Sequence, residues 1–251
     1  MEYYVNENSI VRKIWGKSDT ILFIFAGASA EFALNKAVDW LYFTGKLPRD
    51  PIGRLFSTVS YARKIVFSEK KHAFQAIDKI VSIHASVESS RGYSIPDWAY
   101  RDVLFMLIHY SIASFELLER KLTYTEKEEV FDVFFRMGGR MGLKNMPLTF
   151  QDWLAAREKH LLEDLQKSKL TDNLFSQYRK HLGTFRYRVL IEAQKLVVPK
   201  HVYRLLQFQE IAWLKPAVPV YQLCKKMKLD NFVKSLLLPA EYKEEIKALD
   251  A

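Results

Sequence analysis

The sequence predicts an all-α protein that forms a single multi-helix domain over residues 1–251. Only nine glycines and eight prolines occur in the 251 residues, and they are spread over the whole length. No alternating runs of valine, isoleucine and threonine between turn pairs indicate strands. Hydrophobic residues make up 49% of the chain and aromatic residues 14%, which is enough to bury a core of this size.

Start and stop signals define the first helices. An apolar stretch over residues 21–43 follows a serine and an aspartate, and we expect it to break near Gly27 or Gly45. Asp50 and Pro51 combine a capping residue with a proline at the first helical position. This pair predicts a second helix that ends near residue 67.

The remaining helices follow from the same kind of signal. The helix expected at 71–88 ends in a polar loop, and the next opens near Pro96 with an apolar run over 103–118. Thr125 and Glu128 form a capping-box pattern before 130–141, and Gly142 follows as a stop. Later helices are expected from Thr149, and over 172–196, 200–214 and 240–249.

The net charge of +9 is partly concentrated in one basic segment. Seven lysines and arginines lie between Arg179 and Arg204, against the single acid Glu192. Three interpretations stay open: a solvated helix face, a face for peripheral contact with an anionic membrane or acidic partner, and basic residues that pair with an anionic ligand. No zinc-finger, RNA-recognition or helix-turn-helix motif accompanies the charge, so we expect no nucleic-acid partner.

The cysteine content and the N-terminus favour a cytoplasmic protein. A single cysteine, Cys224, excludes an internal disulfide and a cysteine-rich metal site. The N-terminal residues lack the basic and apolar regions of a secretory signal. The most apolar stretch, 21–30, has about half the length that a bilayer span requires. The oligomeric state is left open.

Among six histidines, His84 is the strongest candidate for chemistry. It shares a helix face with apolar residues such as Phe74 and Ile77, so we expect it to point into the core. A buried imidazole either hydrogen-bonds a polar group or binds a metal or cofactor, and the structural role is the commoner one. Ala85 and Ser86 are small, however, and would let a flat ring system approach the helix.

His109 is the second candidate, in the middle of an apolar run. If the two helices form an antiparallel pair, His84 and His109 are staggered by roughly 12 Å along the axis. We therefore expect His109 to lie near a cofactor without binding it, or to be purely structural. His160 and the other three histidines lie among charged residues and are expected at the surface.

Phosphate loops, dinucleotide fingerprints, nucleophile elbows and zinc-hydrolase motifs are absent from the sequence.

A set of landmarks occurs in a specific order along the chain. They are Asp-Pro-Ile-Gly-Arg-Leu-Phe-Ser-Thr at 50–58, Ile-His-Ala-Ser-Val at 83–87, Gly-Arg-Met-Gly-Leu at 139–143, Met-Pro-Leu-Thr at 146–149 and Leu-Val-Val-Pro at 196–199. In their order and spacing, residues 15–208 resemble the haem oxygenase family that includes fungal MpaB and the bacterial latex-clearing rubber oxygenases. Residues 209–251 are expected to form a helical extension.

The resemblance implies a pocket for haem b (iron protoporphyrin IX), with His84 as the protein ligand to the iron. Arg54 and Thr58 match the family's R-x-x-x-T element; they are four residues apart on one helix face, where they would bond a haem propionate or the bound O2. His109 would act on the distal side. Ser57 stands where the rubber oxygenases have a lysine that serves as distal ligand. The distal ligand is therefore open, and polyisoprene is not the expected substrate.

Other departures affect the surroundings of the haem site. Val81 and Glu88 stand where the rubber oxygenases have basic residues near the axial histidine, and Asp39 loosely matches an acid on their preceding helix. The resemblance implies an oxygenase that cleaves or hydroxylates a hydrophobic small molecule with O2, or a peroxide-driven variant. Two other hypotheses are a haem-binding sensor or electron-transfer protein without turnover, and a cofactor-free scaffold that uses its basic face for membrane or protein contacts.

Overall fold

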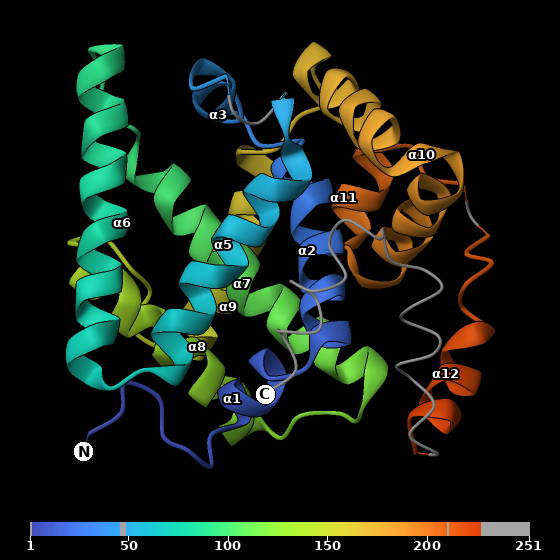
Figure 1. Ribbon diagram of the computed structural model, residues 1–251, viewed down its shortest axis with the longest axis horizontal. Helices are drawn as coiled ribbons and strands as arrows, with labels where there is room; N and C mark the ends of the chain where they lie inside the picture. Colours follow the sequence, from blue (N-terminus) through green and yellow to red (C-terminus); the bar gives the residue numbers. More distant parts are fainter. Residues whose placement is uncertain (1, 46–48, 210, 227–251) are drawn as a thin grey trace.

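The computed structural model describes residues 2–45, 49–209 and 211–226, and in these ranges the regular elements are all helices (Figure 1). They are α1 (Ile10–Trp15), α2 (Ser18–Phe32), α3 (Asp39–Phe43), α5 (Pro51–Phe67), α6 (Lys70–Arg91), α7 (Asp97–Leu118), α8 (Tyr124–Arg140), α9 (Phe150–Glu163), α10 (Lys169–Val197), α11 (Lys200–Leu205) and α12 (Ala217–Lys226). Two isolated bridges are the only β-type pairing in these ranges. The predicted all-α class is confirmed.

The centre of the fold is the contact between α2 and α7, with α10 packed against α2 as well (Figure 1). Gly27 allows this close approach, since a Cβ atom there would lie 2.2 Å from ring atoms of Tyr110 on α7. Of the two predicted breaks, the one near Gly27 was wrong, because that glycine serves helix packing, whereas the one near Gly45 agrees with the end of α3 at Phe43 and the positive φ of Gly45. The stretch instead leaves helical structure after Phe32 and resumes as α3.

The helix termini follow the expected capping chemistry with one shift. Asp50 accepts a hydrogen bond from the backbone N–H of Gly53 at 2.8 Å, and Thr149 caps α9. The capping box lies at Thr123 and Glu126, two residues before the predicted pair. Thr123 has the extended backbone that an N-cap requires, whereas Thr125 already lies within the first turn of α8.

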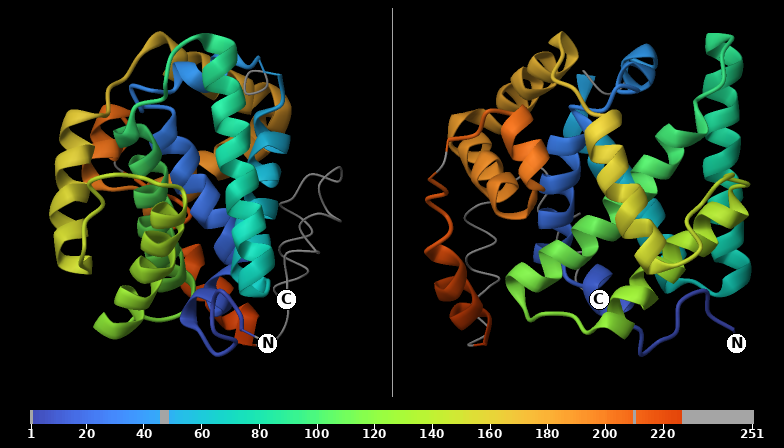
Figure 2. Two further views of the ribbon diagram at one scale, coloured as in Figure 1. Left: turned by 90° about the vertical axis from the view of Figure 1, so that its left-hand side faces the viewer. Right: turned by 180° about the vertical axis from the view of Figure 1, so that it is seen from behind.

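The C-terminal part of the chain differs more from prediction. Gly183, with φ of 70°, interrupts α10 and divides it into two halves, as the second view of Figure 2 shows. The helix expected over 200–214 ends at Leu205, and α1, α3 and α12 were not predicted as separate helices. The helix expected over 240–249 lies outside the described residues. None of the described helices is long and apolar enough to cross a membrane.

Helices α5 and α6 form an antiparallel pair that carries the predicted haem-binding residues. The buried residues of α6, Ala73, Ala76 and Ile77, all lie in its first half. Its second half extends beyond the neighbouring helices (Figure 1). At its end, Arg91 forms an ion pair with Asp39 of α3 at 2.6 Å and lies over the ring of Trp40. This contact ties the tip of α6 to α3.

Candidate functional site

His84 lies half-buried in the second half of α6, whereas its periodicity predicted a place in the core. The apolar face of α6 is covered only as far as Ile77, and Val81 is 36% exposed. The Nδ1 atom of His84 is nevertheless buried, and no described residue supplies it with a hydrogen bond. The imidazole packs against the ring of Tyr100 on α7, with centroids 5.0 Å apart. One nitrogen of this ring is thus shielded from water and unused.

Glu88 holds the ring of Tyr100 in place. Its Oε1 atom accepts hydrogen bonds from the Tyr100 hydroxyl at 3.1 Å and from the backbone N–H of Ile95 at 2.7 Å. The carboxylate therefore fastens the loop between α6 and α7 and positions the aromatic ring that packs on His84. Burial and the nearby Glu88 charge raise the pKa of Tyr100, so the phenol keeps the proton that it donates.

Arg54, in the first half of α5, contributes a positive charge near His84. Burial and this charge lower the pKa of His84, with Glu88 opposing, which favours the neutral imidazole that can coordinate a metal. Burial also lowers the pKa of Arg54 itself. Among the residues with described positions, Arg54 has no acidic side chain within ion-pair distance. Thr58 is exposed, and its hydroxyl donates to the backbone oxygen of Arg54 at 3.1 Å.

The chemistry of these residues fits a haem group. The unused imidazole nitrogen of His84 is a suitable iron ligand, and the guanidinium of Arg54 is a suitable partner for a propionate. Ala85 and Ser86, which follow His84 on α6, are small and exposed. No bulky side chain at these two positions would block the approach of a flat ring. Thr58 shares the helix with Arg54, but its hydroxyl donates to the backbone oxygen of Arg54.

His109 belongs to a different part of the molecule. It lies nine residues after Tyr100 on α7, which corresponds to about 14 Å along the helix. The charged side chains that act on its imidazole are those of Arg157 and Glu31. Burial and the Arg157 charge lower the pKa of His109 to about 4, and Glu31 opposes the shift. The structure therefore does not group His109 with His84, Arg54 and Thr58.

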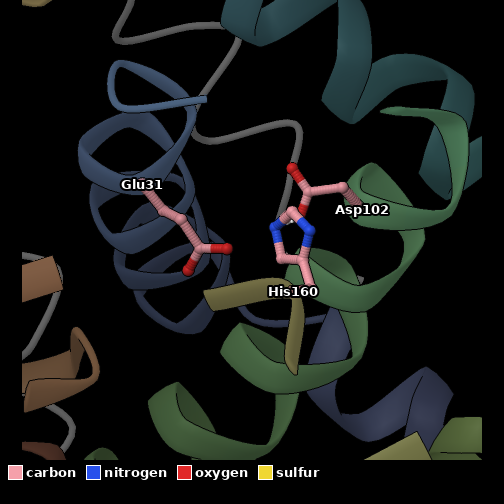
Figure 3. A group of neighbouring side chains, drawn as sticks. All are labelled: Glu31, Asp102 and His160. Atoms are coloured by element: carbon pink, nitrogen blue, oxygen red, sulfur yellow. Dashed lines mark ion pairs between the residues drawn. The ribbon is translucent and has the colours of Figure 1, made fainter. Parts of the chain in front are cut away.

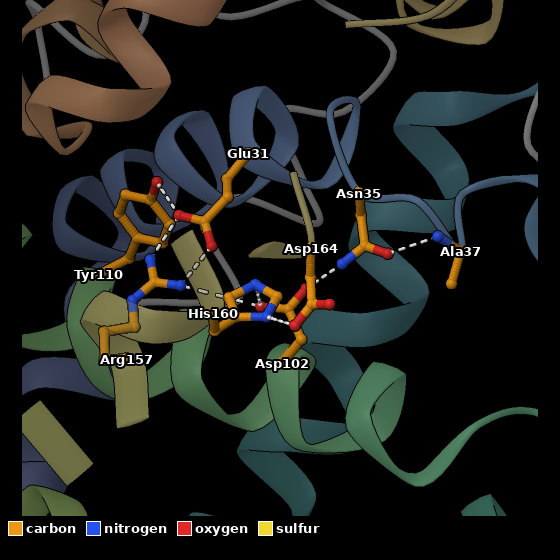
Figure 4. A network of polar contacts seen from close by, with 8 residues as sticks. All are labelled: Glu31, Asn35, Ala37, Asp102, Tyr110, Arg157, His160 and Asp164. Atoms are coloured by element: carbon orange, nitrogen blue, oxygen red, sulfur yellow. Dashed lines mark hydrogen bonds and ion pairs between the residues drawn. The ribbon is translucent and has the colours of Figure 1, made fainter. Parts of the chain in front are cut away.

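Next to His109 lies a buried network of charged side chains (Figure 4). Glu31 on α2 receives two hydrogen bonds of 2.5 Å from the guanidinium of Arg157 on α9. The Tyr110 hydroxyl donates to the same carboxylate at 2.8 Å. Burial alone would raise the pKa of Glu31, but the Arg157 charge outweighs it and the pKa lies below its usual value. Glu31 is thus a carboxylate with its charge neutralised inside the core.

His160 extends this network toward the surface and was wrongly predicted to be exposed. It is 6% exposed, its Nε2 lies against Asp102, and its Nδ1 lies 2.9 Å from Asp164. Burial would lower the pKa of His160, but the bond to Asp102 reverses the effect and the pKa is raised. Burial raises the pKa of Asp102, which also accepts a hydrogen bond from Asn35. The charged neighbours that suggested a surface position are the groups that make burial tolerable.

The same cluster has the donor set of a metal site. Glu31, Asp102 and His160 each offer a ligand atom, and these atoms lie within 4.8 Å of one another (Figure 3). Arg157, however, binds both oxygens of Glu31 and lies 3.8 Å from Asp102. A divalent cation would have to displace this guanidinium, so the geometry favours a buried ion-pair network over a metal centre.

Comparison with known proteins identifies the chain's relatives. Residues 14–227 match the family described as ER-bound oxygenase mpaB/B'/rubber oxygenase, catalytic domain. The chain belongs to this family. No curated protein and no solved structure matches the chain. The match takes in α12, beyond residue 208, where the sequence landmarks end.

Membership makes the chain an oxygenase-type catalytic domain, and hence an enzyme of the oxidoreductase class. In this oxygenase domain the site residues predicted from the sequence lie on α5 and α6, except for His109 on α7, and the buried network was not predicted. One signal was available for Glu31, which is the only charged residue between positions 20 and 34. Its partner Arg157 lies 126 residues away, and nothing local in the sequence links the two.

Proposed function

We propose that this oxygenase domain uses haem b and O2 to oxidise a hydrophobic organic molecule, by cleavage of a carbon–carbon double bond or by hydroxylation. The observation that supports the proposal is the His84 imidazole, whose buried Nδ1 has no hydrogen-bond partner among the described residues, near the Arg54 cation, which has no acidic partner among them. Family membership supports the oxygenase class, and the matching landmarks around both residues support the cofactor.

In this proposal His84 holds the iron and Arg54 binds a propionate, and the bound haem supplies the activation of O2. The chain's own groups set the geometry. Glu88 fixes the Tyr100 ring, which restricts rotation of the His84 imidazole. Ser57 places no amine beside Thr58, so a hydrophobic substrate would meet a small, exposed side chain at this position. His109 would influence the reaction only indirectly, from the middle of α7.

A haem sensor or electron-transfer protein would be favoured by a second strong ligand near His84. Three described histidines are engaged elsewhere, because His109 lies with Glu31 and Arg157, His160 lies with Asp102, and both ring nitrogens of His181 contact backbone oxygens. The oxygenase is therefore the better-supported function. A protein that binds haem but neither reacts with O2 nor oxidises any alkene or alkane would contradict it.

Reconstitution with haemin tests the role of His84. The wild-type protein should give a Soret band whose position and intensity change in His84→Ala, because the axial ligand sets the haem spectrum. His72→Ala is a matched control, since His72 lies on the same helix and is exposed. Identical spectra for the two variants would overturn the assignment. Reduction under CO and product analysis with hydrophobic alkenes then test for oxygenase chemistry.

A further inference from the structure

A second site lies on α10, far from the α5–α6 pair in the chain. The two halves of α10, Lys167 and residues 206–209, 211 and 213 line an open cavity of about 750 Å³, and no residue of α5 or α6 is among its lining residues. This volume is within the range of roughly 300–1,000 Å³ that is typical of small-molecule sites. The turn at Gly183 creates the cavity, because it directs the second half of α10 away from the first.

Much of the cavity wall is apolar and aromatic. Phe175 and Tyr187 line it from the two halves of α10, and Phe208 lines it from the segment after α11. Ile211 and Trp213 also line it, and they are 80% and 52% exposed. Apolar side chains that gather in one groove and are rimmed by polar residues are typical of ligand-binding surfaces. The wall therefore suits the hydrocarbon part of a ligand.

One of the charged side chains that line the cavity has no partner of opposite charge among the described residues. Lys195 pairs with Glu192 at 2.6 Å, and Lys167 pairs with Asp172 at 3.5 Å. The remaining lining charge is Arg188, which is exposed and has no acidic partner within ion-pair distance among the described residues. An unpaired guanidinium beside an apolar wall is suited to a single carboxylate, which it can bind through two hydrogen bonds.

We propose that this cavity binds a monoanionic amphiphile, namely a long-chain carboxylic acid. Its carboxylate pairs with Arg188, and its hydrocarbon chain lies along Phe175, Tyr187 and Phe208 and covers Trp213. The proposed site gives a role to Arg188, one of the basic residues in the segment from Arg179 to Arg204. None of these basic residues belongs to the proposed haem site. The cavity site does not depend on haem, because none of its residues belongs to the α5–α6 pair.

Tryptophan quenching by a bromine-labelled long-chain fatty acid tests the proposal on the full chain. The chain has five tryptophans. Quenching of their fluorescence should saturate in the wild type, and most of the quenching should be lost in Trp213→Phe. Calorimetry with dodecanoate should give a dissociation constant about tenfold or more weaker in Arg188→Glu, because the charge-assisted bonds are lost. Arg188→Lys should stay much closer to the wild type.

Arg179→Glu is the matched control, since Arg179 is an exposed residue of α10 that does not line the cavity. Equal weakening in Arg179→Glu and Arg188→Glu would overturn the proposal, because it would indicate non-specific charge attraction. The affinities of two further ligands for the wild-type protein test the proposal without any variant. Methyl dodecanoate should bind much more weakly than dodecanoate, and dodecyl phosphate should bind no more tightly. Equal binding of the ester, or preference for the phosphate, would refute a carboxylic-acid site.

Discussion

The buried imidazole of His109 makes the stability of the protein depend on pH. Its pKa is about 4 in the folded state, against an ordinary value of 6.5, because burial and Arg157 disfavour the charged form. Between these values the unfolded chain binds a proton that the folded chain does not bind. Stability due to this group therefore falls as the pH drops from about 6.5 to about 4, by at most about 1.4 kcal/mol per pH unit.

Urea unfolding of the wild type and His109→Gln at a series of pH values checks this prediction. The variant should lose less stability than the wild type on acidification over that window, because glutamine does not titrate. His160 acts in the opposite sense: its raised pKa adds stability at low pH that is lost as the pH rises through the folded value. Equal slopes for wild type and variant between pH 6.5 and 4 would show that His109 titrates normally.

At the scale of residues, sequence analysis selects positions whose evidence is local. His84 is a candidate because it shares a helix face with apolar residues, and because the residues after it match a family element. Asp102 and His160 were missed, since each is explained only by a partner on another helix. The half-exposure of His84 was also missed, because periodicity describes a helix face and does not tell where the neighbouring helices end.

At the scale of elements, the contact between α2 and α7 depends on the absence of a side chain at Gly27. In Gly27→Ala the new methyl group would overlap the ring of Tyr110, which also holds Glu31. We expect a loss of about 1–3 kcal/mol in unfolding free energy, because an overpacked core outweighs the better helix propensity of alanine. Thermal and urea unfolding measure this difference.

Gly139→Ala is the matched control for this prediction. Gly139 is also helical, but a Cβ atom there would meet nothing within 4 Å. This variant should gain roughly 0.5–1 kcal/mol, because alanine restricts the unfolded chain and favours the helix. If both variants changed stability in the same direction and by the same amount, Gly27 would not be a packing contact.

Most elements could be predicted, because caps and stops act through neighbouring residues. The boundaries of α5, α7 and α9 follow from Asp50, Pro96 and Thr149, whereas α6 continues to Arg91, three residues beyond its predicted end, and stops at Gly92. The division of α10 could not be predicted, since a glycine inside a helix is compatible with both a straight helix and a turn. Helix α10 packs on α2, α5 and α7, and contacts at this distance along the chain leave no local signal at Gly183.

At the scale of the whole molecule, the packing is uneven. Helices α2, α7 and α10 share a continuous interior, whereas the second half of α6 is held by few contacts, chiefly those of Arg91 with Asp39 and of Glu88 with Tyr100 and Ile95. A region with few buried apolar contacts opens at a lower free energy than the core. Amide hydrogen exchange in the chain without haem should therefore be faster over residues 81–91 than over α2 and α7.

Haem binding should reduce this difference if His84 is the ligand. A group that binds only the folded state stabilises it by about 2.7 kcal/mol at a hundredfold excess over the dissociation constant. The added protection should appear mainly in α6 and in the facing first half of α5, because the proposed contacts lie at His84 and Arg54. It should disappear when the haem is extracted, and it should be absent in His84→Ala but present in His72→Ala. Protection confined to α10 instead would place the haem away from α6 and contradict this account.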